Sequence, residues 1–415
     1  MKLLYLANCV ASAPDKGERI RAYHQLRHLG ARHEVDCLCL GPQPGDEDRA
    51  GDLRRLVSRA EVFPIHRLPA RLRCLWGALG RRPLTLRHFT SRALRRRVDE
   101  LAASHSYDAV VAYCTAAAPY ALRLDGTPRV LDMVDVDSAK WRDLARWTSG
   151  VRAAVYRSEG RRLASYERHV AGRFDRVFLT TSREAGELRL LAPEAHVAVL
   201  RSGIDVGPLL RPEAREAAHP TLVFAGQMDY HPNVDGIVRF VDEVLPALQR
   251  RHPGLVLEIV GRSPTARIRG LSRIAGVVVT GEVPDVDVYL QRAWVFVAPL
   301  RIARGLQYKV LQAMARGLPV VCSSEVMSGL TDGLAGNAGR PLVADEPSEW
   351  TAAIGTLLSD RERRRSLGED GYRTVRREYP ADAGADRLER SLLELTGESD
   401  GSPLRSRVAA ATVGA

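Results

Sequence analysis

The chain has 415 residues, and its 61 Lys and Arg residues against 50 Asp and Glu residues give a formal net charge of +11. This length favours two domains of ordinary size, and a hydrophobic content of 45% is typical of globular proteins. No run approaches the roughly 18 apolar residues of a membrane-spanning helix. The six cysteines form no C-x-x-C pair, which argues against a disulfide framework or a zinc site and favours reduced thiols in a cytosolic protein.

Both halves of the chain alternate short apolar strands with helices. In the first half, strands are expected at 2–6, 35–40, 62–65, 109–113, 129–133 and 175–180, with a helix at 19–29. In the second half, strands are expected at 221–225, 256–260, 277–280, 294–298 and 320–322, separated by helices at 234–251, 286–292, 305–316 and 348–358. Continuous apolar strands between helices are typical of parallel sheets that are covered on both faces.

This pattern predicts an α/β fold with two doubly wound, Rossmann-like domains that face a central cleft. The first domain is expected at 1–205, and a proline-containing polar stretch marks the start of the second domain at 206–380. A terminal helix is expected at 381–397. Residues 398–415 are rich in Gly, Ser and Ala and have no core pattern, so they are expected to form a disordered tail.

The strongest functional signal lies between the last two strands of the second half. A buried strand runs into a loop, a helix is expected to begin near Gly305, and Gly317 ends that helix before the next strand. In a parallel sheet this order places a helix N-terminus at the carboxyl end of a strand, where backbone N–H groups suit an anion such as a diphosphate. Arg301, Arg304 and Lys309 are expected to surround the same point with positive charge.

Gly305, Lys309 and the run Gly317-Leu318-Pro319-Val320-Val321 resemble, in register, the nucleotide-binding motif of family 4 glycosyltransferases of the GT-B fold. The chain is most similar to the subgroup of bacterial sugar transferases associated with exopolysaccharide synthesis. The resemblance implies a GT-B fold whose terminal helix crosses back to the first domain. It also implies retaining transfer of a sugar from a nucleotide-diphosphate donor, without a metal or another cofactor. A lipid-linked saccharide on the cytoplasmic face of a membrane is the expected acceptor.

In this family two glutamates separated by seven residues straddle the helix, one near the transferred sugar and one on the nucleotide ribose. Here these positions hold Arg304 and Gln312. Gln312 can still exchange hydrogen bonds with ribose hydroxyls, although it carries no charge. Lys309 is expected to stabilise the negative charge that develops on the leaving diphosphate, with Arg301 beside it. The resemblance therefore makes Lys309 and Arg304 the catalytic candidates of the second domain.

Two glycine-containing loops resemble the phosphate contacts of the family. In the second domain, Gly226 follows the first strand and gives the backbone access to the donor, and His231 is either a phosphate donor or a turn residue. In the first domain, Lys16, Gly17 and Arg19 follow the first strand, like the loop that meets the donor phosphates and the acceptor. These residues are the predicted substrate contacts outside the main motif.

Asp135 and Asp137 lie at the carboxyl end of a predicted strand, where family members often have a histidine that contacts the donor sugar. Either carboxylate is able to hold a sugar hydroxyl or to accept the proton of the acceptor, so both are catalytic candidates. The alternative is that Asp137 only neighbours the start of a helix. Their Asp-x-Asp spacing is formally that of a metal site, but no metal is expected here.

Ten arginines and no acidic residue occur between Arg67 and Arg97, interleaved with leucines and Trp76. Such a stretch suits an anionic membrane or an anionic lipid-linked acceptor, so peripheral contact with the inner face of the membrane is one prediction. A solvated, arginine-rich surface is the alternative. Nucleic acid is not an expected partner, because no helix-turn-helix, zinc-finger or aromatic RNA-binding pattern accompanies the charge.

Three other functions stay open at this point. The acceptor can be a small secondary metabolite rather than a lipid-linked saccharide. A nucleotide-sugar epimerase shares the fold, but its proton abstraction needs acidic residues, and the segment 301–321 fits it less well. A noncatalytic nucleotide-sugar-binding partner would explain why Gln312 and Ser328 stand where the family has acids.

Overall fold

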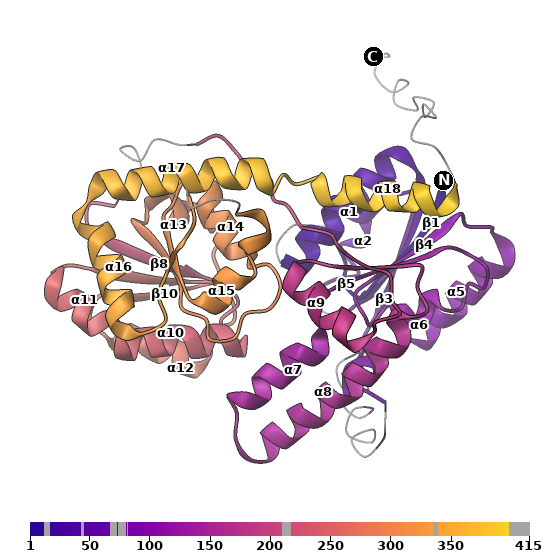
Figure 1. The fold of residues 1–415 in the computed structure, drawn as a ribbon, viewed down its shortest axis with the longest axis horizontal. Helices are drawn as coiled ribbons and strands as arrows, with labels where there is room; N and C mark the ends of the chain where they lie inside the picture. The colour runs from indigo at the N-terminus through magenta and orange to yellow at the C-terminus, as the bar shows by residue number, and fades with distance from the viewer. Residues whose placement is uncertain are drawn as a thin grey trace, which may run out of the picture.

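The computed structural model contains two α/β domains that lie side by side (Figure 1). The structure describes residues 1–11, 17–42, 45–66, 73, 80, 82–209, 217–334 and 339–397. The predicted tail at 398–415, the predicted site residue Lys16 and most of residues 67–81 lie outside this described part. The α/β class with two parallel sheets, predicted from the strand and helix pattern, is confirmed.

The first domain is built on a parallel sheet whose strands are buried because helices cover both faces. Its strands are β1 (Lys2–Ala7), β2 (Glu34–Gly41), β3 (Arg59–Pro64), β4 (Ala109–Tyr113), β5 (Arg129–Val134), β6 (Arg176–Leu179) and β7 (Val197–Val199). Its helices are α1 (Gly17–Arg32), α2 (Ala50–Arg54), α4 (Leu84–His88), α5 (Arg92–Ser104), α6 (Ala118–Ala121), α7 (Asp137–Arg146), α8 (Gly150–Ala171) and α9 (Ser182–Leu191). Among the described residues the strand order is β3-β2-β1-β4-β5-β6-β7.

The second domain has the same architecture. Its strands are β8 (Thr221–Ala225), β9 (Val256–Val260), β10 (Val277–Gly281), β11 (Val295–Ala298), β12 (Val320–Cys322) and β13 (Leu342–Val343). Its helices are α10 (His231–Glu243), α11 (Leu245–Arg251), α12 (Ala266–Gly270), α13 (Asp287–Arg292), α14 (Tyr308–Ala315), α15 (Ser324–Ser328), α16 (Pro347–Ser359) and α17 (Arg361–Glu378). In the order β10-β9-β8-β11-β12-β13, the strand sequence reverses between β8 and β11, and α/β sheets bind ligands at such a switch point.

The structure corrects three details of the predicted elements. The helix expected from residue 305 begins at Tyr308, because Gly305 has a left-handed φ of 56° that a continuing helix does not allow. The single helix expected at 234–251 is two helices, α10 and α11, and a proline in the first turn of α11 suits a new start. The structure also contains β13 and the long helix α8, which the sequence pattern did not predict.

Helix α17 and the last described helix, α18 (Ala383–Thr396), run in line across the two domains (Figure 1). Helix α18 packs against α1, and Leu388 and Leu392 join a core cluster of the first domain. At this contact His28 Nε2 lies 2.7 Å from Glu389 Oε2. The end of the described chain is therefore fastened to the first domain, although the second domain precedes it in sequence.

A buried ion pair ties α1 to β5. Arg21 Nε and Nη2 donate to the two carboxylate oxygens of Asp132 at 2.7 and 2.8 Å, and both side chains are almost fully buried.

We expect Arg21→Met to lower the free energy of unfolding by about 3–5 kcal/mol, because the carboxylate stays buried without its cation. Urea denaturation measures this loss. Arg123→Met is the control, since its pair with Asp99 is exposed and contributes about 1 kcal/mol at most. Equal losses in both variants would contradict the prediction.

Candidate active site

A glycine and a lysine meet in the crevice at the carboxyl ends of β8 and β11. Gly226 directly follows β8, and a Cβ atom on it would lie 2.9 Å from Asn233 Nδ2 and 3.0 Å from Lys309 Nζ. Glycine therefore allows a close approach of the backbone to these side chains. Asn233 lies in the first turn of α10 and Lys309 in the first turn of α14. The predicted residues Gly226 and Lys309 are thus neighbours at two helix N-termini, where anions are favoured.

The Lys309 side chain has a neutral amide, and no acid of the described residues, as its polar partner. Its Nζ donates to Asn233 Oδ1 at 2.5 Å and lies 4.8 Å from the centre of the Phe224 ring. Within the described ranges, no carboxylate pairs with this ammonium group. Burial lowers the pKa of Lys309 to about 7, because the charged form loses hydration without gaining a counter-ion. An anion that binds here supplies the missing counter-ion.

The other predicted contacts of the second domain are Arg301, His231 and Gln312. Arg301 Nε and Nη2 donate to Asp235 at 2.9 and 2.6 Å, and its guanidinium lies 4.3 Å from the ring centre of Trp147. Its charge is therefore already neutralised. His231 begins α10, and its Nδ1 is buried without a hydrogen-bond partner in the described part of the chain, which fits either of its predicted roles. Gln312 is exposed on α14.

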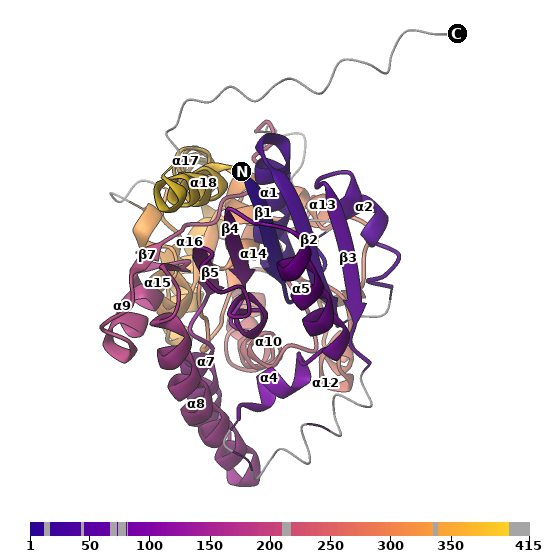
Figure 2. The same ribbon diagram turned by 90° about the vertical axis from the view of Figure 1, so that its right-hand side faces the viewer.

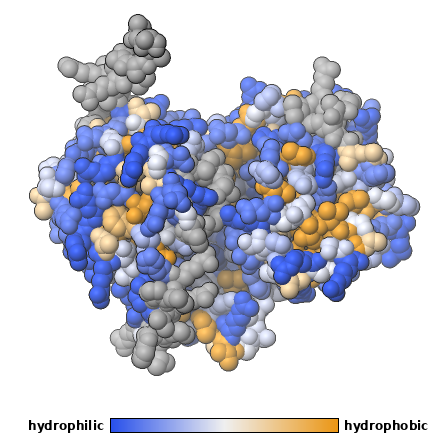
Figure 3. Space-filling view, turned by 180° about the vertical axis from the view of Figure 1, so that it is seen from behind, coloured by the Kyte–Doolittle hydropathy of each residue, from blue (hydrophilic) through white to orange (hydrophobic). Residues whose placement is uncertain are grey.

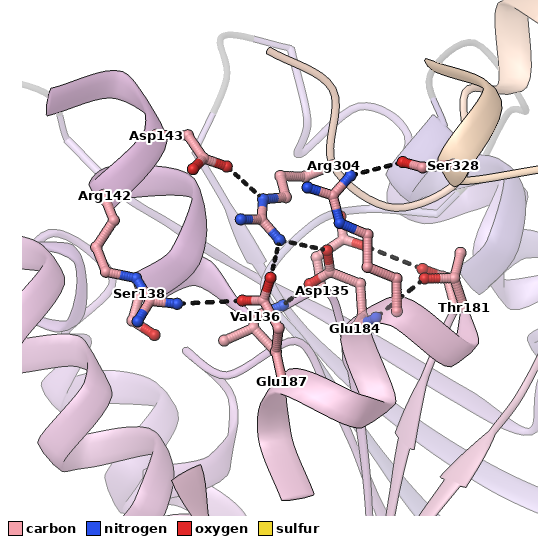
Figure 4. Close-up of polar contacts among 12 residues, drawn as sticks. Asp135, Val136, Ser138, Arg142, Asp143, Thr181, Glu184, Glu187, Arg304 and Ser328 are labelled. Carbon is pink, nitrogen blue, oxygen red and sulfur yellow. Dashed lines mark hydrogen bonds and ion pairs between the residues drawn. The ribbon is translucent and has the colours of Figure 1, made fainter. Parts of the chain in front are cut away.

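Arg304 reaches from the second domain to three carboxylates of the first domain (Figure 4). Its Nε lies 2.6 Å from Asp143 Oδ2, and its Nη1 lies 2.6 Å from Glu187 Oε1 and 3.3 Å from Glu184 Oε1. Burial raises the pKa of Glu184 to about 7, and the charge of Arg304 opposes that rise. The prediction that Arg304 shares one point with the other cations is corrected, because three acids of α7 and α9 hold its guanidinium.

A second set of contacts joins the same two domains beside Arg304. Arg183 Nη1 donates to Glu325 Oε2 at 2.9 Å and to Ser328 Oγ at 2.6 Å. The backbone N–H of Ser182 donates to the carboxylate of Asp332. The start of α9 is therefore fastened to α15 and the loop after it. Together with Arg304, these contacts link the two domains across the cleft.

The backbone of Gly305, in the second domain, lies directly against Asp135 of the first domain. A Cβ atom on Gly305 would lie 2.0 Å from Asp135 Oδ1, and a Cβ atom on Gly329 would lie 2.2 Å from the Gly305 carbonyl oxygen. Asp135 accepts a hydrogen bond from Thr180 Oγ1 at 2.9 Å, and burial raises the pKa of its carboxyl group. The preceding Val134 has a φ of 70°, which is strained for a β-branched residue. Strain at the end of β5 thus places Asp135 in the cleft.

Asp137 has a different environment from Asp135. It is the first residue of α7, and burial raises its pKa while the nearby Lys140 opposes the rise. The backbone N–H of the next residue, Ser138, donates to Glu167 Oε1 at 3.0 Å, and burial raises the pKa of Glu167 to about 8. The two predicted carboxylates therefore have different neighbours, with Asp135 against the second domain and Asp137 at a helix start, although the charge of Asp137 also raises the pKa of Asp135.

The loop predicted to bind phosphates from the first domain is only partly described. Lys16 lies outside the described residues, and Gly17 begins α1. The Arg19 side chain is buried, and its Nη2 lies 2.7 Å from Asp46 Oδ1. The prediction that Arg19 contacts the donor is corrected, because this guanidinium points into the first domain and pairs with an acid there.

A cavity of about 500 Å³ lies between the two domains. Trp147 and Arg183 line it from the first domain, and Arg301, Glu325 and Trp350 line it from the second. Its wall mixes aromatic rings with charged groups that are partly paired with each other, as in Arg183 with Glu325. Interdomain cavities of this kind are common ligand sites.

Gly305→Ala tests whether the contact with Asp135 matters. We expect the variant to slow the sugar transfer that the resemblance implies by about tenfold, because a methyl group meets Asp135 and alanine is strained at positive φ by roughly 1–3 kcal/mol. Steady-state release of the nucleoside diphosphate that this transfer would produce measures the rate. Gly186→Ala is the control, since a Cβ atom there meets nothing within 4 Å. A Gly305→Ala rate equal to that of the control would contradict the prediction.

Two Rossmann-like domains, with Gly226 and Lys309 at the switch point of the second sheet, define the class of two-domain α/β proteins with the GT-B fold. Residues 16–203 match the model of the glycosyl transferase 4-like domain, and residues 219–360 match the model of glycosyl transferases group 1. The protein belongs to the family 4 glycosyltransferases, as the resemblance in the sequence predicted. Its exopolysaccharide subgroup stays a prediction.

Individual relatives and solved structures agree with this assignment. The chain is 25% identical over 260 residues to the lipopolysaccharide core biosynthesis mannosyltransferase LpcC of Rhizobium leguminosarum bv. viciae, covering 58% of this chain and 70% of that protein. It is 27% identical over 227 residues to the D-inositol 3-phosphate glycosyltransferase of Nocardia farcinica, covering 49% of each chain. Its fold is similar to that of HepE of Anabaena, solved with UDP and glucose, with a TM-score of 0.67 at 13% identity over 95% of this chain and 100% of that chain.

Proposed function

We propose that the protein is a retaining glycosyltransferase that moves a sugar from a nucleotide-diphosphate donor to the hydroxyl group of a saccharide or lipid-linked acceptor. The observation that carries this proposal is Lys309, whose partly buried ammonium group lies beside Gly226 at the switch point of the second sheet and pairs with no carboxylate of the described residues. A diphosphate fits the charge, the position and the backbone access of this site. The similarity to HepE, solved with UDP and glucose, supports a nucleotide-sugar donor.

The chemistry assigned to the site follows from where charge develops. The bond between the sugar C1 and the diphosphate oxygen breaks, the electron pair stays on the diphosphate, and a bond forms between C1 and the acceptor oxygen. The ammonium of Lys309 stabilises the developing charge on the leaving group more than the charge of the intact donor. Asp135, in the cleft, is the candidate to hold a sugar hydroxyl or to receive the proton of the acceptor.

The acceptor side of the proposal is a glycoconjugate or an exopolysaccharide. The similarity to a lipopolysaccharide core mannosyltransferase supports an acceptor of this class. The interdomain cavity offers room for a saccharide near Arg304 and its acids. None of the helices in the described ranges is both long and apolar enough to cross a bilayer. A lipid-linked acceptor resides in a membrane, and the arginine-rich stretch at 67–97 is one candidate for contact with the membrane surface.

A screen of nucleotide sugars with the purified protein tests the function. Release of nucleoside diphosphate, faster with a saccharide acceptor than without, is the expected result, and the anomeric configuration of the product shows retention. Binding of the nucleotide without turnover would favour a noncatalytic partner. Conversion of the donor into an isomer without release of the diphosphate would favour an epimerase.

Nucleotide binding should take up a proton at Lys309. The pKa of Lys309 is lowered to about 7, so this group is mostly neutral at pH 8 in the free protein. A bound diphosphate favours the ammonium form and raises that pKa. We therefore expect close to one proton to be taken up on UDP binding at pH 8, and the affinity to fall as the pH rises above about 7. Calorimetry in two buffers of different ionisation enthalpy measures the uptake, and Lys309→Met should abolish it. Equal uptake in both proteins would contradict the prediction.

A further inference from the structure

Helices α7 and α8 form a hairpin that projects from the first domain (Figures 1 and 2). At its tip, which we define as residues 146–157, three large hydrophobic side chains are exposed. Trp147 is 49% exposed, Val151 is 83% exposed and Val155 is 44% exposed. Val151 and Val155 are four residues apart in α8, so they lie on one face of the helix. Figure 3 shows hydrophobic atoms beside hydrophilic ones at the lower end of the molecule, where the hairpin projects.

The exposed charges of the hairpin are positive. Its exposed arginines include Arg146, Arg152, Arg157, Arg161 and Arg168. In the described part of the chain, Arg146 has a carboxylate partner, and no carboxylate pairs with Arg152, Arg157, Arg161 or Arg168. Helical rotation of about 100° per residue places Arg152 and Arg161 on opposite sides of the stripe that starts at Val151.

The acids of the hairpin are turned inward. Glu159 is buried and accepts hydrogen bonds from the backbone N–H groups of Leu84 and Thr85, each at 2.8 Å. Glu167 is also buried and holds the backbone of α7, while Asp143 holds Arg304. The fourth acid, the partly buried Asp137, begins α7. An apolar stripe flanked by arginines therefore faces solvent, and no carboxylate of the described residues pairs with Arg152 or Arg161 beside it.

We propose that this tip docks on the surface of an anionic lipid bilayer. Trp147, Val151 and Val155 would enter the interface between headgroups and acyl chains, where tryptophan is favoured. The flanking arginines reach the anionic headgroups while their stems cover apolar surface. The charge favours an anionic surface, and the apolar stripe favours a bilayer over nucleic acid, which presents phosphates instead of an apolar layer.

The docked tip lies beside the interdomain cavity. Trp147 lines that cavity and stacks on Arg301 of the second domain, with its ring centre 4.3 Å from the guanidinium. A membrane at the tip therefore places the mouth of the cavity near the headgroups, from which a lipid-linked acceptor can enter. The entry of a lipid-linked acceptor beside the tip rests on the proposed function, whereas the docking of the tip on a membrane does not.

Sedimentation with lipid vesicles tests the docking. Vesicles of phosphatidylcholine alone and of phosphatidylcholine mixed with phosphatidylglycerol are incubated with the purified full chain, without substrates. The wild type should sediment with the mixed vesicles only. Val151→Glu should bind about tenfold more weakly. Leu190→Glu is the matched control, since Leu190 is 87% exposed on α9 and the charge change is the same, so it should bind like the wild type.

Two outcomes overturn the docking. One is a wild-type protein that does not bind the mixed vesicles, whether or not it binds double-stranded DNA. The other is equal vesicle binding by Val151→Glu and Leu190→Glu, which would place the contact elsewhere, for example at 67–97. The thermal midpoint of each variant checks the fold. Donor turnover is measured separately, so a protein that binds vesicles but releases no nucleoside diphosphate contradicts the proposed function and keeps the docking.

Discussion

Lys309→Ala is expected to lower the rate of sugar transfer by about 10²–10³-fold, the usual effect of removing one group that stabilises developing charge. The ammonium of Lys309 lies at the switch point of the second sheet, beside Gly226, with a neutral amide as its hydrogen-bond partner. Without it, the leaving diphosphate loses the cation that neutralises it in the transition state. Because the effect is on the transition state, kcat should fall more than the affinity for the donor.

Steady-state release of nucleoside diphosphate, with the donor concentration varied, separates kcat from KM for this variant. Arg250→Ala is the control, because Arg250 is an exposed cation of the same domain in the last turn of α11. The control should keep the wild-type rate. An Lys309→Ala variant that is folded and as fast as the control would remove Lys309 from the mechanism.

Arg304→Ala is expected to shift the protein toward an open arrangement of its domains. The guanidinium of Arg304 pairs with Asp143, Glu184 and Glu187 across the cleft. Removing the cation leaves the buried Glu184 and the partly buried Asp143 and Glu187 without it, and losing the partner of a buried acid costs about 3–5 kcal/mol. That cost falls on the closed state, because the arginine and the acids belong to different domains. Turnover should fall on the order of 10²-fold or more, since Gly305 then leaves Asp135.

Small-angle X-ray scattering tests the opening, because an open arrangement has a larger radius of gyration. Arg304→Lys should recover part of the rate but not all of it, since an ammonium cannot hold three carboxylates in the fork geometry of a guanidinium. Arg189→Ala is the control on α9, where the Arg189 side chain bonds the backbone of Val197. Scattering and turnover that match the control in Arg304→Ala would contradict this role.

The parallel sheets were predictable because buried strands of such sheets are continuous apolar runs. The predicted strands at 109–113, 221–225 and 256–260 coincide with β4, β8 and β9. The hairpin of α7 and α8 was missed because polar and apolar residues are mixed along α8 and the helix starts at a glycine, which sequence patterns associate with loops. The start of α14 was misplaced since the left-handed conformation of Gly305 is set by contacts with Asp135 and Gly329, which are tertiary.

The candidate site was predictable where topology alone decides which residues meet. Gly226 and Lys309 follow neighbouring strands, so their approach follows from the strand order. The partners of the arginines were not predictable, because Arg19 and Arg304 form ion pairs with acids that are far away in sequence. Glu184 and Glu187 resemble solvated helix residues, and their spacing of three residues on one face of α9 was the available signal.

A crystal structure of the complex with UDP tests the central claim most directly. The account predicts that the diphosphate lies beside Gly226, with a phosphate oxygen within hydrogen-bond distance of Lys309 Nζ in place of or in addition to Asn233. A nucleotide bound elsewhere, with Lys309 still held by Asn233 alone, would contradict it.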